Sequence, residues 1–233
     1  MSARKIRVLI VDDSLFMRAA IAKTLGNGAF EIVGQAKSGS EALTVVGKLA
    51  PDVITMDFNM PGLNGAETVR ALMQQRPTPV VMFSAHTKQG AKETFDALAA
   101  GAVDFVTKPA GEVSTDLSKI ADELVRKLTA AAQSRPRAIV PLMATRTSSP
   151  TLGIPRTTQT GGLPRLAVIA ISTGGPAALS QVIPALPPEL KLAIVVVQHM
   201  PAGFTQPLAE RLNSLSRVAV REAADIVPCP ARS

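Results

Sequence analysis

The sequence predicts an α/β protein: a doubly wound parallel sheet, then a linker, then the start of a second α/β domain. Over residues 6–128, five short apolar runs alternate with five amphipathic stretches, the order expected of successive β-α units. The runs are apolar throughout rather than alternating, which indicates strands buried on both faces, as in a parallel sheet. The same pattern resumes at residue 166, after a segment without any period.

The elements of the first domain follow from these runs. We expect strands at 6–12, 31–35, 52–57, 79–84 and 103–107. We expect helices at 14–25, 39–49, 65–75, 88–99 and 113–132. The first domain is therefore placed at residues 1–130.

The chain then changes character. Pro, Ser, Thr and Gly dominate from residue 133, so residues 131–163 are expected to be a flexible linker. Two further apolar runs, 166–171 and 192–198, predict two more buried strands, with a helical stretch at about 176–185 between them. The second, partial domain is placed at residues 164–233.

Composition limits the classes of partner. Of the net charge of +7, residues 129–163 carry +4, from four basic and no acidic residues. A solvated linker explains this better than a nucleic-acid surface, and the absence of Tyr and Trp argues against base stacking. The apolar runs are too short to cross a bilayer, no signal peptide is evident, and Cys229 has no second cysteine to pair with. We expect a cytoplasmic location, no membrane insertion and no nucleic-acid partner.

Polar side chains stand at the ends of four of the expected strands. Asp12 and Asp13 close the first strand, Asp57 the third and Ser84 the fourth, and Lys108 follows the fifth. Because the carboxyl ends of parallel strands lie along one edge of a sheet, these side chains should converge.

The residue types suggest phosphoryl chemistry. Three carboxylates in one cluster call for a hard cation such as Mg²⁺, and Lys108 supplies a point charge for an anion. Asp57 is then the best covalent acceptor of a phosphoryl group. The alternative is that Asp12 or Asp57 merely caps the following helix, which would suffice for either residue alone but not for all five in this order.

These residues lie in the segments VDDS, MDFNMPGLNG, FSA and VTKP, which resemble the receiver domain of two-component response regulators over residues 5–128. The resemblance implies a flavodoxin-like sheet and phosphorylation at Asp57. It also implies that Asp13 and Asp57 bind Mg²⁺ with the backbone carbonyl of Asn59, and that Asp12 completes the acidic pocket.

The same resemblance gives roles to three more residues. Ser84 would hydrogen-bond the phosphoryl group and Lys108 would pair with it. Phe105, three residues before the lysine, matches the aromatic switch position of receivers; read alone, it would be a core residue.

A second constellation begins in AISTGGPAA, where Ser172 ends the apolar run at 166–171. Gly174 and Gly175 permit a tight turn into a helix, and His199 directly follows the next apolar run. If the two strands are adjacent and parallel, Ser172 and His199 could act as nucleophile and general base. Alternatively, Ser172 is a helix N-cap and His199 a structural histidine.

The stretches AISTGGPAAL and VVVQHMPAGFTQPLAERLN resemble the start of the catalytic domain of CheB-type chemotaxis protein-glutamate methylesterases. The resemblance implies a hydrolase with Ser172 as nucleophile and His199 as general base, and with Thr173 shaping the turn. Its implied substrates are glutamate methyl esters of methyl-accepting chemoreceptors, with receptor glutamines in many members. Its implied phosphodonor is a chemotaxis histidine kinase, and the esterase needs no cofactor.

The end of the sequence departs from this family. Asp225 is the only aspartate after His199, and it matches a segment that precedes the family's catalytic acid. We therefore expect a truncated chain that lacks the triad aspartate. An alternative function is a phosphorylatable receiver switch with an inactive output. A DNA-binding output is disfavoured because no helix-turn-helix pattern follows residue 133.

Overall fold

The computed structural model describes residues 4–26, 28–85, 87–108, 120–134 and 166–223. The first sheet has the strand order β2-β1-β3-β4-β5, and every neighbouring pair is parallel. This is the order of flavodoxin-like folds, so the expected fold class is confirmed. The strands are β1 (Ile6–Val11), β2 (Phe30–Ala36), β3 (Val53–Asp57), β4 (Val80–Ser84) and β5 (Asp104–Thr107).

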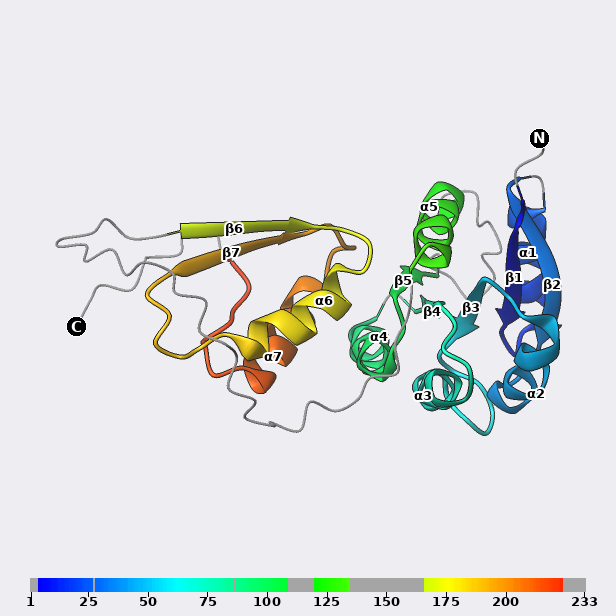
Figure 1. The fold of residues 1–233 in the computed structure, drawn as a ribbon, viewed down its shortest axis with the longest axis horizontal. Coiled ribbons are helices and arrows are strands. Elements are labelled where there is room, and N and C mark those ends of the chain that lie inside the picture. Colours follow the sequence, from blue (N-terminus) through cyan, green and yellow to red (C-terminus); the bar gives the residue numbers. More distant parts are fainter. Residues whose placement is uncertain (1–3, 27, 86, 109–119, 135–165, 224–233) are drawn as a thin grey trace, which may run out of the picture.

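Helices cover both faces of this sheet (Figure 1). One apolar cluster lies between the sheet and the helices α2, α3 and α4, and a second lies under α1 and α5. Strands β3, β4 and β5 are buried along their whole length, as their unbroken apolar sequences predict. The helices are α1 (Leu15–Leu25), α2 (Gly39–Leu49), α3 (Gly65–Gln75), α4 (Lys88–Ala100) and α5 (Ala121–Ala132). The expected start of the last helix, at residue 113, lies outside the described residues.

Helix capping excludes one alternative for the aspartates. The N-cap of α1 is Ser14, whose hydroxyl accepts from Met17 N, and the N-cap of α3 is Asn64, which forms a capping box with Glu67. Neither Asp12 nor Asp57 caps the helix that follows it. Their position at the strand ends therefore needs another explanation.

The second segment forms a two-stranded parallel sheet of β6 (Leu166–Ile171) and β7 (Ala193–Gln198). Helix α6 (Gly175–Val182), the short 3-10 turn η2 (Ile183–Ala185) and helix α7 (Thr205–Leu215) complete it. The sequence reading missed α7. Its Pro207 lies in the first turn, where a helix tolerates proline, and Leu208 and Leu212 form the buried face.

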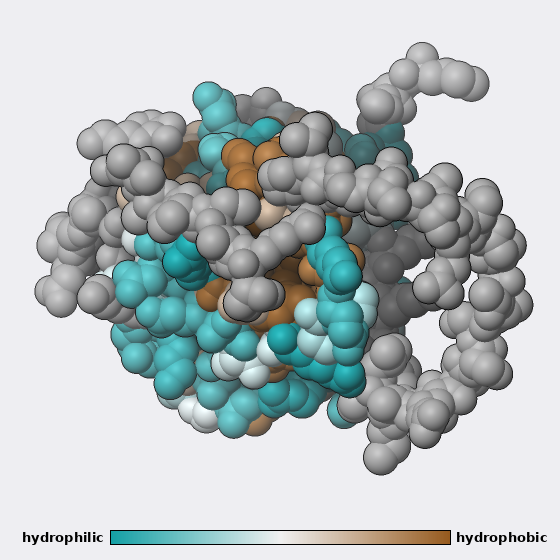
Figure 2. All heavy atoms as spheres, turned by 90° about the vertical axis from the view of Figure 1, so that its left-hand side faces the viewer, coloured by the Kyte–Doolittle hydropathy of each residue, from teal (hydrophilic) through white to brown (hydrophobic). Residues whose placement is uncertain are grey.

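The two strands of this second sheet are not buried, contrary to expectation. Strand β6 alternates between exposed and half-buried positions, and in β7 the three residues 195–197 are all exposed. Figure 2, which faces this end of the molecule, shows hydrophobic side chains at the surface among hydrophilic ones. Contiguous exposed apolar surface of this kind is unusual in a monomeric globular protein. The exposed apolar residues of the strands are Leu166, Val168, Val195, Val196 and Val197. None of the described helices is long and apolar enough to cross a membrane.

The second segment packs against α4 and β5 of the first (Figure 1). Phe204, in the loop before α7, is buried, stacks on Phe105 with 4.9 Å between ring centroids, and meets the edge of Phe95. An ion pair of 2.8 Å joins Arg211 of α7 to Asp96 of α4. Apolar stacking and a charge pair therefore hold the two segments together.

Gly65 provides a test of the packing around the carboxyl end of β3. A Cβ at this position would lie 2.7 Å from Asp57 O and 2.8 Å from Phe58 Cα, both backbone atoms that cannot move aside cheaply. We expect Gly65→Ala to lower the free energy of unfolding by about 2 kcal/mol, measured by urea titration. Gly47→Ala is the matched control in α2, because nothing lies within 4 Å of its Cβ, and it should be neutral or stabilising. Equal effects of the two variants would contradict this account.

Candidate functional site

Three carboxylates meet at the carboxyl edge of the first sheet. Asp12 and Asp13 follow β1 and Asp57 ends β3, as the strand pattern predicted. Each offers an oxygen within 4.8 Å of the others. Asp12 and Asp57 are buried, whereas Asp13 is exposed. The sheet topology thus brings together acids that are far apart in the sequence.

Lys108 supplies the positive charge at this cluster. It follows β5, and its Nζ lies 2.9 Å from Asp57 Oδ1 and 3.4 Å from Asp12 Oδ2. Because the site is largely removed from water, these attractions are screened less than they would be at the surface.

The pKa values reflect this crowding. Burial raises the pKa of Asp57 from 3.8 to about 6; Lys108 opposes the rise, and the charge of Asp12 adds to it. Burial likewise raises the pKa of Asp12, again against the attraction of Lys108. Burial by itself lowers the pKa of Lys108, but Asp57 and then Asp12 outweigh it, so the net shift is upward. The cluster holds more negative charge than one lysine compensates.

The donor set fits a hard divalent cation. Carboxylate oxygens are the ligands that Mg²⁺ prefers, and the exposed Asp13 leaves one side of the cluster open to water or a phosphate. Asn59, expected to contribute its backbone carbonyl, lies two residues beyond β3 and is exposed, with its side-chain amide 3.4 Å from Glu93 Oε2. The cluster of three carboxylates is therefore consistent with a Mg²⁺ site.

Ser84 and Phe105 have partners within the fold. The buried Ser84 hydroxyl donates to Gly90 O at 2.9 Å and accepts from Thr94 Oγ1 at 2.7 Å, so α4 engages it in this arrangement. Phe105 is buried against Phe204 of the second segment. The aromatic residue singled out in the sequence thus lies where the two segments meet.

Ser172 and His199 lie side by side at the carboxyl ends of β6 and β7. The strands pair in parallel, with Ile171 opposite Gln198. The residues that follow, Ser172 and His199, therefore lie opposite each other. Ser172 Oγ lies 3.4 Å from His199 Nδ1. This distance suits a loose hydrogen bond between a hydroxyl and an imidazole, the arrangement of a nucleophile and its base.

Ser172 is not a helix cap. Helix α6 begins at Gly175, and its N-cap is Gly174, in the left-handed conformation with φ +74° and without any side-chain cap. Glycine adopts this conformation without strain, so it forms the sharp turn after the serine. The N-cap alternative for Ser172 is therefore wrong.

Gln198 is a positioning residue that the sequence did not reveal. Its amide nitrogen donates to Ser172 O and to His199 O, each at 3.0 Å, so one side chain ties the ends of both strands together. Gly175 leaves room for it, since a Cβ there would lie 2.0 Å from Gln198 Oε1. A glutamine at the end of an apolar strand is a weak signal without the pairing register.

Two residues of the first segment form hydrogen bonds with the turn after Ser172. Arg126 of α5 donates to Thr173 Oγ1 at 2.9 Å, and the buried Asp104 of β5 accepts from Gly174 N at 3.2 Å. Sequence reasoning missed both residues. The signal in the sequence was Asp104, an acid within the run predicted as a strand at 103–107.

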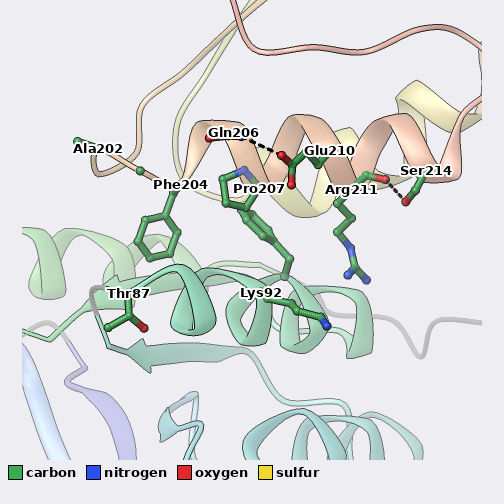
Figure 3. A pocket seen from close by; sticks show the side chains of 11 residues that line it. Thr87, Lys92, Ala202, Phe204, Gln206, Pro207, Glu210, Arg211 and Ser214 are labelled. Carbon is green, nitrogen blue, oxygen red and sulfur yellow. Dashed lines mark hydrogen bonds between the residues drawn. The ribbon is translucent and has the colours of Figure 1, made fainter.

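A pocket of about 660 Å³ lies between α4 and α7, and none of the polar residues of either site lines it (Figure 3). Phe204 and Phe95 form its apolar part, and Lys92 and Arg211 bring positive charge from the two sides. The pocket belongs to the contact between the segments rather than to either site. Asp225, singled out in the sequence, lies outside the described residues.

Two protein families match different parts of the chain. The family described as "Response regulator receiver domain" matches residues 8–118, and the family described as "CheB methylesterase" matches residues 167–231. A solved structure, the response regulator domain of Thermotoga maritima CheB, is 46% identical with a TM-score of 0.54. It covers 57% of this chain, and the chain covers all of it.

Longer relatives match both parts together. A protein of Symbiobacterium thermophilum named protein-glutamate methylesterase/protein-glutamine glutaminase is 48% identical over 229 residues, which is 94% of this chain. Relatives of the same name from Archaeoglobus fulgidus and Thermotoga maritima are 47% and 44% identical over 93% and 97% of this chain. The chain spans 61% to 64% of the lengths of these three relatives.

The raised pKa of Asp57 predicts how stability depends on pH without Mg²⁺. The folded state holds the Asp57 proton up to about pH 6, the unfolded state only to 3.8, so stability falls as pH rises through this window. With a chelator at about pH 7.5, Asp57→Asn should raise the free energy of unfolding by about 1 to 3 kcal/mol. The gain should shrink towards about pH 4, where Asp57 is neutral.

Asp122→Asn is the control for this measurement, because Asp122 is exposed on α5 and should change little at any pH. A destabilised Asp57→Asn protein near neutral pH would mean that the ion pair with Lys108 outweighs the burial of charge.

Proposed function

Because the chain belongs to the CheB methylesterases that carry a response regulator receiver domain, we propose that it is a protein-glutamate methylesterase controlled by phosphorylation. The observation that carries the proposal is the approach of Ser172 Oγ to His199 Nδ1 within the segment that matches the esterase family. In this proposal the receiver occupies residues 1–130, the linker 131–163 and the esterase segment 164–233.

The receiver accepts a phosphoryl group on Asp57. A carboxylate oxygen of Asp57 attacks phosphorus, and the bond to the donor nitrogen of a chemotaxis histidine kinase breaks. Asp12, Asp13, Asp57 and the backbone carbonyl of Asn59 would hold a Mg²⁺ ion, which would supply positive charge for the phosphoryl oxygens.

Two further side chains respond to the phosphoryl group. Lys108, already 2.9 Å from Asp57, pairs with its oxygens. Ser84 bonds to it after its hydroxyl leaves Gly90 O, which frees the region of α4 and Phe105 to rearrange. Phosphorylation thereby shifts the contact between the segments.

The esterase segment hydrolyses glutamate methyl esters. Ser172 Oγ attacks the ester carbonyl carbon while His199 accepts its proton, and His199 then protonates the departing methoxide so that methanol leaves. Water, activated by the same imidazole, hydrolyses the acyl-serine and releases the glutamate carboxylate. A glutamine side chain would react by the same route with loss of ammonia. The proposed substrates are methylated chemoreceptors.

One observation favours a second function, a receiver switch with little esterase activity. Among the described residues, the His199 ring bonds only to Ser172 and has no carboxylate partner. Without an orienting acid, a serine-histidine pair loses several orders of magnitude in rate.

Phosphorylation is tested with acetyl phosphate and Mg²⁺. Mass spectrometry should show one phosphoryl group on the wild-type chain and none on Asp57→Asn, because Asp57 ends β3 in the acidic cluster with its oxygen 2.9 Å from Lys108, closer than that of Asp12. Asp122→Asn, an exposed acid on α5, should be modified like the wild type. Phosphorylation that survives in Asp57→Asn would contradict the assignment.

Esterase activity is tested by methanol release from methylated chemoreceptor membranes. Ser172→Ala should reduce release by about a thousandfold or more, because no other group replaces the nucleophile. Ser214→Ala, at an exposed serine of α7, is the control and should retain the wild-type rate. If the wild type releases no more methanol than Ser172→Ala after phosphorylation, the switch function is the correct one.

A further inference from the structure

The contact between α4 and α7 leaves a pocket that the proposed phosphorylation and ester hydrolysis do not use (Figure 3). Its volume of about 660 Å³ is that of a small-molecule site. Helix α4 forms one wall, and α7 with the loop before it forms the other. Because residues of both segments line the pocket, a ligand there would touch both at once.

Two aromatic rings form the apolar part of the pocket. Phe95 of α4 and Phe204 of the loop before α7 meet edge to face, with 6.4 Å between ring centroids and 66° between ring planes. Figure 3 shows Phe204 extending towards α4, with Pro207 beside it. Aromatic side chains favour a further ring, which can lie against a ring face or a ring edge. This part of the pocket therefore suits a flat aromatic group.

Two cations line the same pocket. Lys92 is exposed on α4, and no acid among the described residues forms an ion pair with it. Asp96, one turn further along α4, pairs with Arg211 of α7 at 2.8 Å. Lys92 and Arg211 therefore lie near each other across the contact, as Figure 3 shows. Glu210, also in the lining, accepts from Gln206 at 2.9 Å, so the lining holds two cations and one carboxylate.

The guanidinium of Arg211 has an edge without an acceptor. Asp96 accepts from Nη1, whereas Nε is buried and, like Nη2, has no hydrogen-bond partner among the described residues. Nε and Nη2 form a pair of parallel donors of the kind that binds both oxygens of a carboxylate. A buried N–H without a partner costs free energy, which an acceptor in the pocket would recover.

We propose that this pocket binds an aromatic carboxylate. The ring of the ligand lies against Phe95 and Phe204. Its carboxylate accepts from Nε and Nη2 of Arg211, with Lys92 nearby. An inorganic anion would use only the charged part of the pocket, and a neutral aromatic compound only the apolar part. A molecule that carries both groups uses both parts, so charge and shape together define the class of ligand.

The first experiment titrates the whole chain with 2-naphthoate and follows backbone amide resonances by nuclear magnetic resonance. The amides of Gly203 and Lys92, from the two walls of the pocket, should shift saturably. We expect a dissociation constant of about 1 mM or lower for a ligand of this size. The neutral compound of the same shape, 2-naphthamide, should bind about tenfold more weakly, because it lacks the charge that the two cations attract.

Variants test the two cations separately. Lys92→Gln should weaken the binding of 2-naphthoate about tenfold, because a charged partner is lost. Arg211→Lys should also weaken it about tenfold, since the lysine keeps the charge opposite Asp96 but lacks the paired donors. Lys48→Gln, at an exposed lysine of α2, is the control and should bind like the wild type.

The inference is overturned if 2-naphthoate gives no saturable shift or if 2-naphthamide binds equally well. Shifts that gather at the exposed residues 195–197 instead of the pocket also overturn it, because they mean adsorption to the apolar face of β7. Equal affinities of Lys92→Gln, Arg211→Lys and Lys48→Gln would rule out recognition of the carboxylate. Ser172→Ala should bind 2-naphthoate like the wild type, so the result stands whether or not the chain is an active esterase.

Discussion

The crowding of buried charge at the carboxyl edge of the first sheet, where Lys108 meets Asp57 and Asp12, is the constraint on which the receiver site depends. Parallel strands bring Asp12, Asp13 and Asp57 to one edge, where burial and mutual repulsion oppose their charges. Lys108 is the cation that reaches both buried acids, and it does so because β5 ends directly before it. The pair therefore fixes the end of β5 relative to β3.

The four-residue strand β5 connects the carboxylate cluster to the second site. Strand β5 has Lys108 beyond one end and Asp104 at the other. Asp104 holds Gly174, and Phe105 stacks on Phe204, so the strand touches both the loop after Ser172 and the loop after His199. A strand this short offers little room for independent movement of its ends. The carboxylate cluster around Asp57 is thereby connected to the segment that holds Ser172 and His199 by packing and hydrogen bonds.

The exposed face of β6 and β7 shows the limits of a two-stranded sheet. The strands are apolar, but the described residues place only α6 and α7 against them, so Val168, Val195 and Val197 remain exposed. Even so, parallel pairing suffices to bring Ser172 to His199. The proposed catalytic pair thus depends on local register rather than on a complete core.

The sequence alone determined the five-stranded α/β fold, because its unbroken apolar runs alternate with amphipathic stretches of helical period. It also identified Asp12, Asp13, Asp57 and Lys108, because polar residues at the ends of parallel strands must share an edge. It did not predict α7, where a proline in the first turn hides the helical pattern, and it overestimated the burial of β6 and β7.

Only the tertiary structure decided how the two segments meet. The contacts of Asp104 with Gly174, Arg126 with Thr173 and Phe105 with Phe204 join residues 47 to about 100 positions apart. No local period encodes such contacts. From the sequence alone, Ser172 could be either a helix cap or a nucleophile, because both occur before a glycine turn. The φ of Gly174 and the pairing of β6 with β7 excluded the cap, since they start the helix beyond the serine and place its hydroxyl 3.4 Å from the His199 ring.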